Sequence, residues 1–379
     1  MTERIGLWLN GARGSVATTA ISGLLALRAG LVPPTGCVTE LLDADLPQWD
    51  AFVVGGHDIA TTPLAKRVES LVRDGVLPHD VAGCIGGGLD AADAEIRPGY
   101  DPESSHGSQA DAARRLADDI ADFRTRHGLA RVVVVNVAST EPSVQVPHDS
   151  VAALEEALAV PGNVVLPPSS LVAYAAFQAG CAFVDFTPST GVALSALDEL
   201  ARAKSLPYAG RDGKTGETLL RAALAPMFTS RALRVLSWAG TNLLGGGDGA
   251  TLENPAHADS KLASKARGLA ALLGEGVTAP LHIDHVPDLG ERKTAWDHVS
   301  FEGFLGARMS LQLTWSGLDS SLAAPLVLDL ARLVAAAHAA GRVGAQGALA
   351  FFFKDPLGSD EHRLAEQARE LHEWARGLA

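Results

Sequence analysis

The 379-residue chain has few cysteines, no zinc-binding pattern and no secretion signal. Its three cysteines, Cys37, Cys84 and Cys181, form no CxxC pair, so we expect three small buried residues in a reducing cytoplasm. No basic region precedes a long apolar core at the N-terminus, so we expect no signal peptide. His282 and His285 are three residues apart and would face opposite ways on a strand, so we predict no metal site.

Long apolar runs and positive charge are also scarce. The longest apolar stretch, residues 322–341, contains Asp329, Arg332 and His338, which indicates a buried helix and not a membrane span. The formal net charge of −13 and the pI of about 5.3 argue against nucleic acid or an anionic membrane as the main partner. An anionic small molecule would therefore need a local group of cations.

Only seven lysines occur in the chain, and four of them have unusual surroundings. Lys261 and Lys265 are four residues apart and would share one face of a helix, where like charges repel by a few tenths of a kcal/mol. Lys293 and Lys354 stand in mostly apolar segments. A chain keeps such lysines cheaply on its surface, or because an anion binds between them. We interpret the four as a candidate site.

Strand-like and helix-like segments alternate along the first part of the chain. The continuous apolar runs are typical of parallel strands that are buried on both faces. They cover residues 4–9, 51–55, 130–137, 183–186 and 233–236. This order predicts an α/β fold with a Rossmann-type, doubly wound parallel sheet. Residues 85–107 show no clean period and predict a surface excursion or a mobile loop.

From about residue 237 the pattern changes. Residues 307–316 alternate apolar and polar side chains, as does a strand with one covered face in an antiparallel sheet. The tail from residue 361 has the apolar stripe of an amphipathic helix. We therefore predict that residues 1–236 and 320–379 form the doubly wound domain, and that residues 237–319 form an inserted α+β domain.

The first strand is followed by a glycine turn and a helix. Gly11 and Gly14 would let the backbone turn tightly and bring helix N–H groups to a pyrophosphate. The match to GxGxxG is incomplete, because Trp8 and Leu9 stand where a first glycine belongs. Asp58 follows the second apolar run, where a carboxylate usually holds a ribose diol, although it could instead be a helix N-cap. Together these residues predict dinucleotide binding.

Two further glycine-rich segments are ambiguous. Residues 210–217 look like a phosphate loop but lack the GxxxxGK[ST] spacing. Thr215 and the backbone could bind a sugar phosphate, or the segment could be an exposed turn. Residues 245–249 could form a flexible hairpin, or approach a ligand closely with Asp248 as a polar anchor.

Nine ordered motifs extend over nearly the whole chain, among them NGARGSVATT, GRDGKTGET and FKDP. They lie at residues 10–19, 55–59, 186–190, 210–218, 244–249, 260–265, 293–297, 318–326 and 353–356. In these motifs the chain resembles the inositol-3-phosphate synthases, also called myo-inositol-1-phosphate synthases, and their bacterial branch in particular. The resemblance implies a Rossmann-type domain that binds NAD and an inserted domain for catalysis and homotetramer formation. It implies conversion of glucose 6-phosphate to 1D-myo-inositol 3-phosphate.

The resemblance also implies roles for individual residues. The family's active-site lysines fall on the four already singled out, Lys261, Lys265, Lys293 and Lys354. The cofactor contacts fall on Gly11, Ala12, Arg13, Gly14, Ser15, Asp58, Ala138, Ser139, Thr140, Asp212, Gly247, Asp248, Asp319 and Ser320. The contacts to the substrate phosphate fall on Thr215, Gly216, Glu217 and Asn242. An activating cation, ammonium or a divalent metal, is left open.

The implied chemistry explains why cations are needed. NAD takes hydride from C5, the ketone enolises at C6, the enolate attacks the C1 aldehyde, and the hydride then returns. Each step develops negative charge on an oxygen, which ammonium groups in a dry site stabilise. One lysine could also serve as the acid and base at O5.

The chain departs from the family at its glycine loop. Gly246 and Gly247 stand where many members have two polar residues, and Leu243 stands where eukaryotic members commonly have histidine. This puts the substrate in doubt more than the reaction. One alternative is a paralogue of secondary metabolism that closes a five-membered ring from fructose 6-phosphate. A catalytically dead NAD-binding regulator is a third possibility, which the four lysines disfavour.

Overall fold

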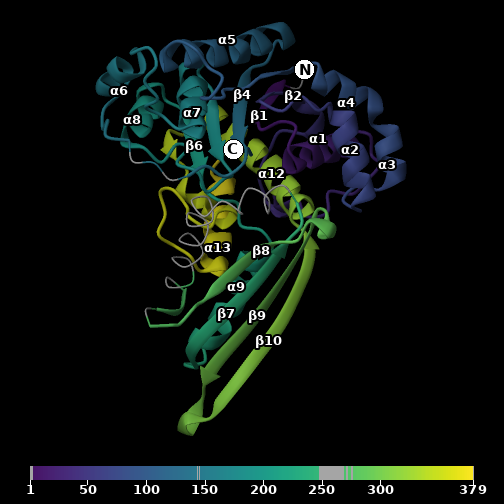
Figure 1. The fold of residues 1–379 in the computed structure, drawn as a ribbon, viewed down its shortest axis with the longest axis vertical. Helices are drawn as coiled ribbons and strands as arrows, with labels where there is room; N and C mark the ends of the chain where they lie inside the picture. Colours follow the sequence, from purple (N-terminus) through teal and green to yellow (C-terminus); the bar gives the residue numbers. More distant parts are fainter. Residues whose placement is uncertain are drawn as a thin grey trace.

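The computed structural model describes residues 3–142, 144, 146–246, 269, 272–274 and 276–378. Figure 1 shows two parts: a layered part in which helices enclose a parallel sheet, and a long sheet that extends away from it. The two sheets have seven and four strands in the described part of the chain. The functional interest lies where the two parts meet.

The first sheet is parallel throughout, with the order β11-β6-β5-β4-β1-β2-β3. Its strands are β1 (Ile5–Asn10), β2 (Phe52–Asp58), β3 (Ile96–Pro98), β4 (Arg131–Asn136), β5 (Ala182–Asp185), β6 (Pro207–Gly210) and β11 (Gly344–Ala345). Every residue of β1 is buried, which is why the central strands appear as continuous apolar runs. The predicted doubly wound α/β fold is confirmed.

Helices cover both faces of this sheet (Figure 1). Leu7 and Leu9 of β1 pack in a core with α1, α2 and α12, whereas Trp8 between them packs in a second core with α5, α7 and α8. The α-helices are α1 (Ser15–Arg28), α2 (Leu64–Arg73), α3 (His79–Cys84), α4 (Gly86–Asp93), α5 (Gln109–His127), α6 (Val151–Leu158), α7 (Pro168–Gln178), α8 (Ser195–Ala203), α9 (Gly216–Thr229), α12 (Asp319–Ala339) and α13 (Leu364–Arg376). The 3₁₀ helices are η1 (Val38–Leu41), η2 (Trp49–Ala51), η3 (Pro287–Leu289), η4 (Phe304–Gly306) and η5 (Gly347–Phe352).

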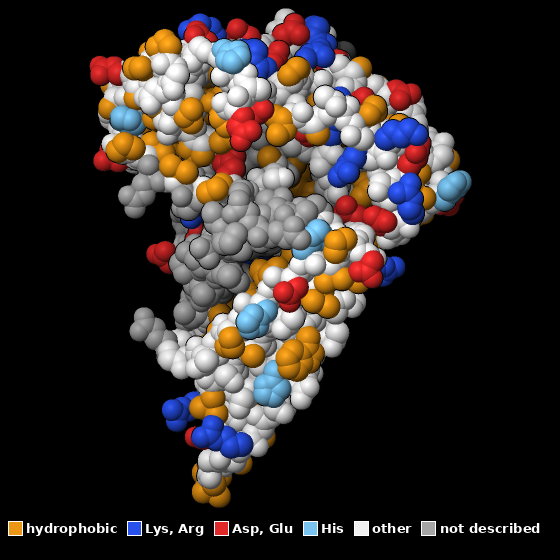
Figure 2. Space-filling model, viewed as in Figure 1, with side chains coloured by type: hydrophobic (Ala, Val, Ile, Leu, Met, Phe, Trp, Pro, Cys, Tyr) orange, Lys and Arg blue, Asp and Glu red, His pale blue; other side chains and the backbone are white. Residues whose placement is uncertain are grey.

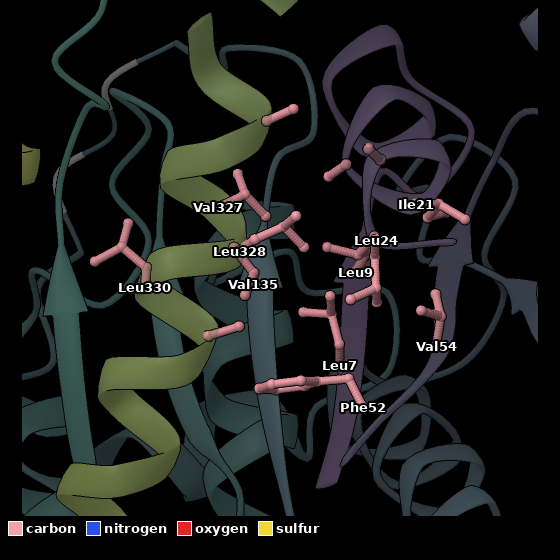
Figure 3. Packing of buried hydrophobic residues seen from close by; sticks show 14 of the residues in the cluster. Leu7, Leu9, Ile21, Leu24, Phe52, Val54, Val135, Val327, Leu328 and Leu330 are labelled. Carbon is pink, nitrogen blue, oxygen red and sulfur yellow. The ribbon is translucent and has the colours of Figure 1, made fainter. Parts of the chain in front are cut away.

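The long apolar helix α12 is a core element. Figure 3 shows Val327 and Leu328 pointing from α12 toward Leu9 of β1 and Leu24 of α1. The helix is long and apolar enough to cross a membrane by length and composition alone, but 72% of its most apolar window is buried inside the protein. The prediction of a buried helix is confirmed.

The prediction of a surface excursion at residues 85–107 is wrong over α4 and β3. The helix α4 begins with three glycines, whose helix propensity is poor, so the sequence pattern does not predict a helix there. Gly88 packs closely on α1: a Cβ on it would lie 2.7 Å from a methyl carbon of Leu25, so a larger residue would have to displace that side chain. Local propensity alone therefore does not set the structure here.

Two smaller predictions also need correction. Cys37 and Cys181 are buried, but Cys84 is exposed, because it ends the short helix α3, in which no residue is buried. The run at 233–236, predicted as a parallel strand of the first sheet, instead begins β7 of the second sheet. Its place in the first sheet is taken by β6 and β11, which are too short to show a period.

The second sheet consists of four strands in the order β10-β9-β7-β8. They are β7 (Arg234–Leu244), β8 (Leu281–His285), β9 (Arg292–Glu302) and β10 (Arg308–Leu318). β9 is antiparallel to both β7 and β10, which confirms the antiparallel strand predicted at 307–316. The helix α9 packs on one face, where Phe228 contacts Trp238 and Phe301 with ring centroids 6.1 and 5.0 Å apart. The domain division at residues 236 and 320 stays a proposal.

The other face of the second sheet carries uncharged side chains along three adjacent strands. The strand register aligns Thr241 of β7 with Trp296 of β9 and Thr314 of β10. Histidine and apolar side chains lie along this sheet in Figure 2. The face is formed by Ser237, Ala239, Thr241, Leu243, Thr294, Trp296, His298, Ser300, Ser310, Gln312, Thr314 and Ser316.

Candidate active site

Hydrogen-bonded side chains join the carboxyl ends of three neighbouring strands of the parallel sheet. Asn10 at the end of β1 donates from Nδ2 to Oδ1 of Asn136 at the end of β4, at 2.8 Å. Asn136 in turn donates to Oδ1 of Asp185 at the end of β5, at 3.1 Å. Ligands of open α/β sheets bind outside the carboxyl ends of the strands. This polar row therefore marks the floor of the candidate site.

The glycine turn after β1 lies directly against the loop after β4. Gly11 has a φ of +85°, and a Cβ on it would lie 2.7 Å from the Cα atom of Ala138. Gly14 is the N-cap of α1, so the first N–H groups of that helix open toward this edge of the sheet. Ser139 and Thr140 continue the loop after β4, and Thr140 is buried. The structure thus brings together the predicted cofactor residues of the two loops.

Asp58 lies beside the same turn at the end of β2. Its carboxylate accepts hydrogen bonds from the backbone N–H groups of Arg13, at 2.6 Å, and of Ala60, at 2.7 Å. The alternative role of a helix N-cap is not seen, because α2 begins six residues later, at Leu64. The Arg13 side chain turns away to pair with Asp93 at 3.0 Å. The carboxylate of Asp58 therefore fixes the backbone of the glycine turn, and it lies on the side of the turn where a ribose would bind.

The first turn of α1 also contacts the second sheet. Ser15 donates from Oγ to a carboxylate oxygen of Glu291 at 2.6 Å, and Arg67 of α2 donates to the same hydroxyl at 3.3 Å. Glu291 lies just before β9. The predicted cofactor helix is thereby linked to the part of the chain that contains Lys293.

The segment before α9 lies between the two parts of the molecule. Thr215 is the N-cap of this 14-residue helix, and a Cβ on Gly216 would lie 3.4 Å from a carboxylate oxygen of Asp319. The N-terminus of α9 therefore lies against the start of α12. The N–H groups of its first turn point out of the helix, and with its positive end they make it suitable for an anion.

A buried charge network ties α9 to the second sheet. Glu217, which is 1% exposed, pairs with Arg221 at 2.6 Å and accepts a hydrogen bond from Asn242 at 2.7 Å. Arg221 also pairs with Asp297 of β9 at 2.7 Å, and Trp238 donates to the same carboxylate at 2.8 Å. The charge of Glu217 is thus balanced inside the protein. Its side chain positions the helix, which sequence reasoning did not anticipate.

Two of the four predicted lysines lie in the described part of the chain, and both form partly buried ion pairs. Lys293 donates to Asp319 at 3.2 Å and is 7% exposed. Lys354 donates to Asp212 at 2.7 Å, and the Lys354 side chain is 10% exposed. The other predicted site residues, Lys261, Lys265, Gly247 and Asp248, lie outside the described residues.

Two buried ionisable groups near this edge were not predicted. Burial raises the pKa of Glu141, in the loop after β4, to about 7, against the hydrogen bonds it accepts from Ser169. Burial and the neighbouring ammonium of Lys354 lower the pKa of Lys214 to about 7. Glu141 directly follows the predicted cofactor contacts at residues 138–140, and Lys214 lies inside the motif at residues 210–218, but neither was predicted as a site residue.

Comparison with known proteins identifies the family. The family model described as myo-inositol-1-phosphate synthase matches residues 5–376. An inositol-3-phosphate synthase of Bacteroides thetaiotaomicron is 32% identical over 410 aligned residues, which cover 96% of this chain and 91% of that protein. The chain belongs to the myo-inositol-1-phosphate synthase family.

Two solved structures share the fold. The inositol-3-phosphate synthase of Caenorhabditis elegans superposes with a TM-score of 0.86 at 20% identity, over 100% of this chain and 86% of that one. A myo-inositol-1-phosphate synthase-related protein of Thermotoga maritima superposes with a TM-score of 0.81 at 24% identity, over 98% of both chains. At these identities the likeness shows the fold alone.

Family membership makes the chain an NAD-dependent isomerase, as predicted. The residues present fit the cofactor, because the contact between Gly11 and Ala138 leaves no side chain between the turn and a bound pyrophosphate. Two predicted contacts also have buried polar atoms without a hydrogen-bond partner in the described part of the chain. These atoms are Oγ of Ser320, which is a predicted cofactor contact, and Oδ1 of Asn242, which is a predicted contact to the substrate phosphate. Such atoms are suited to a ligand.

The pKa of Glu141 predicts a pH-dependent stability. Because this pKa rises from 4.5 to about 7 on folding, the group favours the folded state below pH 4.5 and loses that contribution as the pH rises through about 7. The shift corresponds to roughly 3 kcal/mol. In the ligand-free protein, Glu141→Gln should therefore be more stable than the wild type near pH 8 and nearly equal to it near pH 4.5.

Urea unfolding at both pH values measures this difference. The exposed Glu103 offers a matched control, since Glu103→Gln should behave as the wild type at each pH. A Glu141→Gln variant whose stability relative to the wild type did not change with pH would contradict the assignment.

Proposed function

We propose that the chain cyclises glucose 6-phosphate to 1D-myo-inositol 3-phosphate, with NAD regenerated in each cycle. The proposal rests on the loop before α9, which has a partly buried lysine–carboxylate pair on each side. Lys354 pairs with Asp212 at the start of the loop. At its end, Gly216 lies against Asp319, and Asp319 pairs with Lys293. The inositol-3-phosphate synthases named above support this choice of substrate and product.

NAD would supply hydride transfer: it would take a hydride from C5 of the sugar phosphate and return it to the sugar after ring closure. In this chain the N-terminus of α1, beyond Gly14, would receive the pyrophosphate, and Asp58 would hold the ribose beside the glycine turn. The polar row of Asn10, Asn136 and Asp185 would lie beneath the cofactor. These roles follow from position, since each group lies at the carboxyl edge of the sheet.

We assign the substrate phosphate to the N-terminus of α9. The backbone N–H groups of Gly216 and the next residues are the first of a 14-residue helix and have no acceptor within that helix. The carboxylate of Glu217 does not oppose a phosphate there, because it is bonded to Arg221 and Asn242. Its contact to the phosphate would be through the backbone. Thr215 would add a hydroxyl at the N-cap.

The lysines would serve the reacting oxygens. We assign proton transfer at O5 to Lys354, because Asp212 holds its ammonium at 2.7 Å and stabilises it whenever it forms. Lys293 would stabilise negative charge on a substrate oxygen during enolisation. Lys261 and Lys265 keep the predicted role of further oxyanion donors.

One observation keeps fructose 6-phosphate as a second candidate substrate. A Cβ on Gly246 would lie 3.6 Å or more from the carboxylate of Glu291, which is ordinary contact, so this position has room for a side chain that the chain lacks. Fewer side chains near the sugar would suit the shorter reach of a C6 enolate to a C2 ketone. That reaction would close a five-membered ring.

We further propose a homotetramer that forms through the uncharged face of the second sheet. This face is wide, spans three strands and includes Trp296, which is 42% exposed. Two copies could bury these three strands with little desolvation of charge, since the charged side chain that the register places beside them, Asp284, belongs to the outer strand β8. A cytoplasmic location, which free Cys37, Cys84 and Cys181 would suit, is proposed as well.

The proposed function makes a prediction about the product. The protein with glucose 6-phosphate and substoichiometric NAD should form a six-carbon cyclitol phosphate without accumulating NADH, because the hydride is returned. Carbon NMR of products from isotopically labelled sugar phosphates, with nicotinamide absorbance followed in parallel, measures both quantities. Conversion of fructose 6-phosphate alone would replace the first candidate with the second, and stoichiometric NADH would exclude both.

The lysine assignments predict large losses of rate with little loss of structure. Lys293→Ala and Lys354→Ala should each reduce kcat by about 10²–10³, the usual effect of removing one preorganised donor to an oxyanion. Circular dichroism should show an intact fold. Lys204→Ala, at an exposed lysine, is the matched control and should keep wild-type turnover. Near-native rates in both site variants would show that the lysines do not act on the substrate.

The tetramer predicts that one charge on the sheet face changes the assembly. Trp296→Asp should lower the mass measured by analytical ultracentrifugation, because the introduced carboxylate would be buried unpaired between two copies. Leu41→Asp alters an apolar residue that is 74% exposed elsewhere and should leave the mass unchanged. A wild-type monomer, or a Trp296→Asp variant with wild-type mass, would contradict the proposal.

A further inference from the structure

Trp315, near the end of β10, carries a buried polar atom without a partner. Its side chain is half-buried, and its Nε1 is shielded from solvent but donates to no acceptor in the described part of the chain. Indole has one N–H donor and no acceptor, so the missing partner has to be an acceptor. A buried donor that lacks an acceptor is costly and uncommon in folded proteins. The indole of Trp315 is therefore suited to a ligand that accepts a hydrogen bond.

The indole N–H lies beside the first residue of α9. A Cβ on Gly216 would lie 3.5 Å from Nε1 of Trp315 and 3.4 Å from Oδ1 of Asp319. Because Gly216 has no side chain, the indole nitrogen borders the space next to its backbone. The N–H groups of the first turn of α9 point out of the helix at this same end. Donors from the helix and from the second sheet therefore meet at one place.

The strand register explains how the indole reaches this place. Trp315 lies opposite Ala295 of β9, and Ala295 lies opposite Asn242 of β7, so the three side chains share one face of the sheet. Asn242 donates to Glu217 in the first turn of α9, so this row lies under the N-terminus of the helix. A Cβ on Gly317 would lie only 3.0 Å from Nε1 of Trp315, so the indole lies over that glycine.

Two nearly fully buried side chains at the same end of α9 also have an atom without a partner. Oδ1 of Asn242 accepts no hydrogen bond within the described residues, although Asn242 is 1% exposed and its Nδ2 is bound to Glu217. Oγ of Ser320, the residue after Asp319, is likewise unpartnered there, and Ser320 is 2% exposed. An amide oxygen and a hydroxyl match the hydroxyl groups of a sugar. The indole of Trp315 supplies a donor to the same site.

The charges around this site are compatible with an anion. Asp319, whose carboxylate lies beside Gly216, pairs with Lys293 at 3.2 Å. Glu217 pairs with Arg221 at 2.6 Å. Each of these two carboxylates thus has a cation of its own. The positive end of the helix and the partial positive charge of the indole N–H then favour negative charge at this point.

We propose that Trp315 binds the substrate: its indole N–H donates to a phosphate oxygen of the sugar phosphate at the N-terminus of α9. The proposal rests on the proposed function, which places the substrate phosphate there. A phosphate group has three strong acceptor oxygens, so it accepts from the helix N–H groups and from the indole at once. The phosphate takes no part in ring closure. The hydrogen bond from Trp315 therefore contributes to affinity for phosphorylated sugars and not to the chemical steps.

The indole resonance of Trp315 tests this contact without any turnover. The chain has six tryptophans, so the isotopically labelled protein gives six indole N–H resonances in NMR spectra. The resonance of Trp315 is the one that is lost in Trp315→Phe, or in Trp315→His if the first variant does not fold. Inorganic phosphate, added to the wild type in the presence of NAD, should move this resonance, because the N–H gains an acceptor. Sodium chloride at the same ionic strength should leave it in place.

Kinetics separate substrate binding from a structural role. Trp315→Phe keeps a flat ring but removes the donor, so KM for the sugar phosphate should rise roughly 10- to 100-fold, the size of a hydrogen bond to a charged group. The value of kcat should change little, as it does when uniform binding is lost. Trp315→His can place Nε2 where the indole nitrogen lies, so it should recover part of the lost affinity.

Trp49→Phe is the matched control for these variants. Trp49 lies just before β2, at the amino end of the parallel sheet and away from the site, so this variant should keep the wild-type KM. A Trp315 resonance that phosphate does not move, or a Trp315→Phe variant with the wild-type KM, would overturn the proposal.

The two measurements also distinguish this proposal from the proposed function. If the wild type converts neither glucose 6-phosphate nor fructose 6-phosphate, the proposed function is wrong, and the phosphate titration still decides whether Trp315 binds the anion. If turnover is normal but Trp315→Phe leaves KM unchanged, the proposed function stands and the role of Trp315 is refuted.

Discussion

At the candidate site of this chain, whose net charge is −13, the ammonium groups of Lys293 and Lys354 each pair with one carboxylate. The two pairs flank the loop that leads into α9, so each cation is fixed relative to the N-terminus of that helix. Because Asp319 begins α12 and Asp212 follows β6, both anchors belong to the layered part of the molecule. The site therefore depends on how firmly the second sheet is attached there.

That attachment uses buried charge as well as apolar packing. Arg221 of α9 lies between Glu217 and Asp297, and both carboxylates pair with its guanidinium. Removing one member of such a network leaves an uncompensated buried charge and costs several kcal/mol. The register of α9 on the second sheet is thus strictly determined, and with it the position of the helix N-terminus. Lys214 stands in contrast, since the groups that accept hydrogen bonds from its side chain, Gln367 and Ala350, are neutral.

Much of the fold follows from the sequence, because strands buried on both faces have continuous apolar runs and the glycine turn has its own signature. The misses have physical causes. The sequence did not predict α4, because the helix begins with three glycines, one of which packs closely on Leu25 of α1. The run at 233–236 has the composition of a parallel strand, and only pairing with β9 places it in the other sheet. For the site, local sequence singled out the lysines, and the resemblance supplied their roles. Lys214 escaped notice because its burial depends on Gln367, 153 residues away.

In the proposed chemistry, phosphate binding and stabilisation of the reacting oxygens fall to different groups. A phosphate at the N-terminus of α9 meets backbone dipoles, whose positive end needs no counter-ion and is not neutralised by Glu217. Lys293 and Lys354 already have carboxylates, so a second anion is not required to stabilise them in the resting enzyme. Their positive charge is then matched to oxygens that become negative only during the reaction. Such an arrangement favours the transition state over the bound substrate, which is the condition for raising kcat.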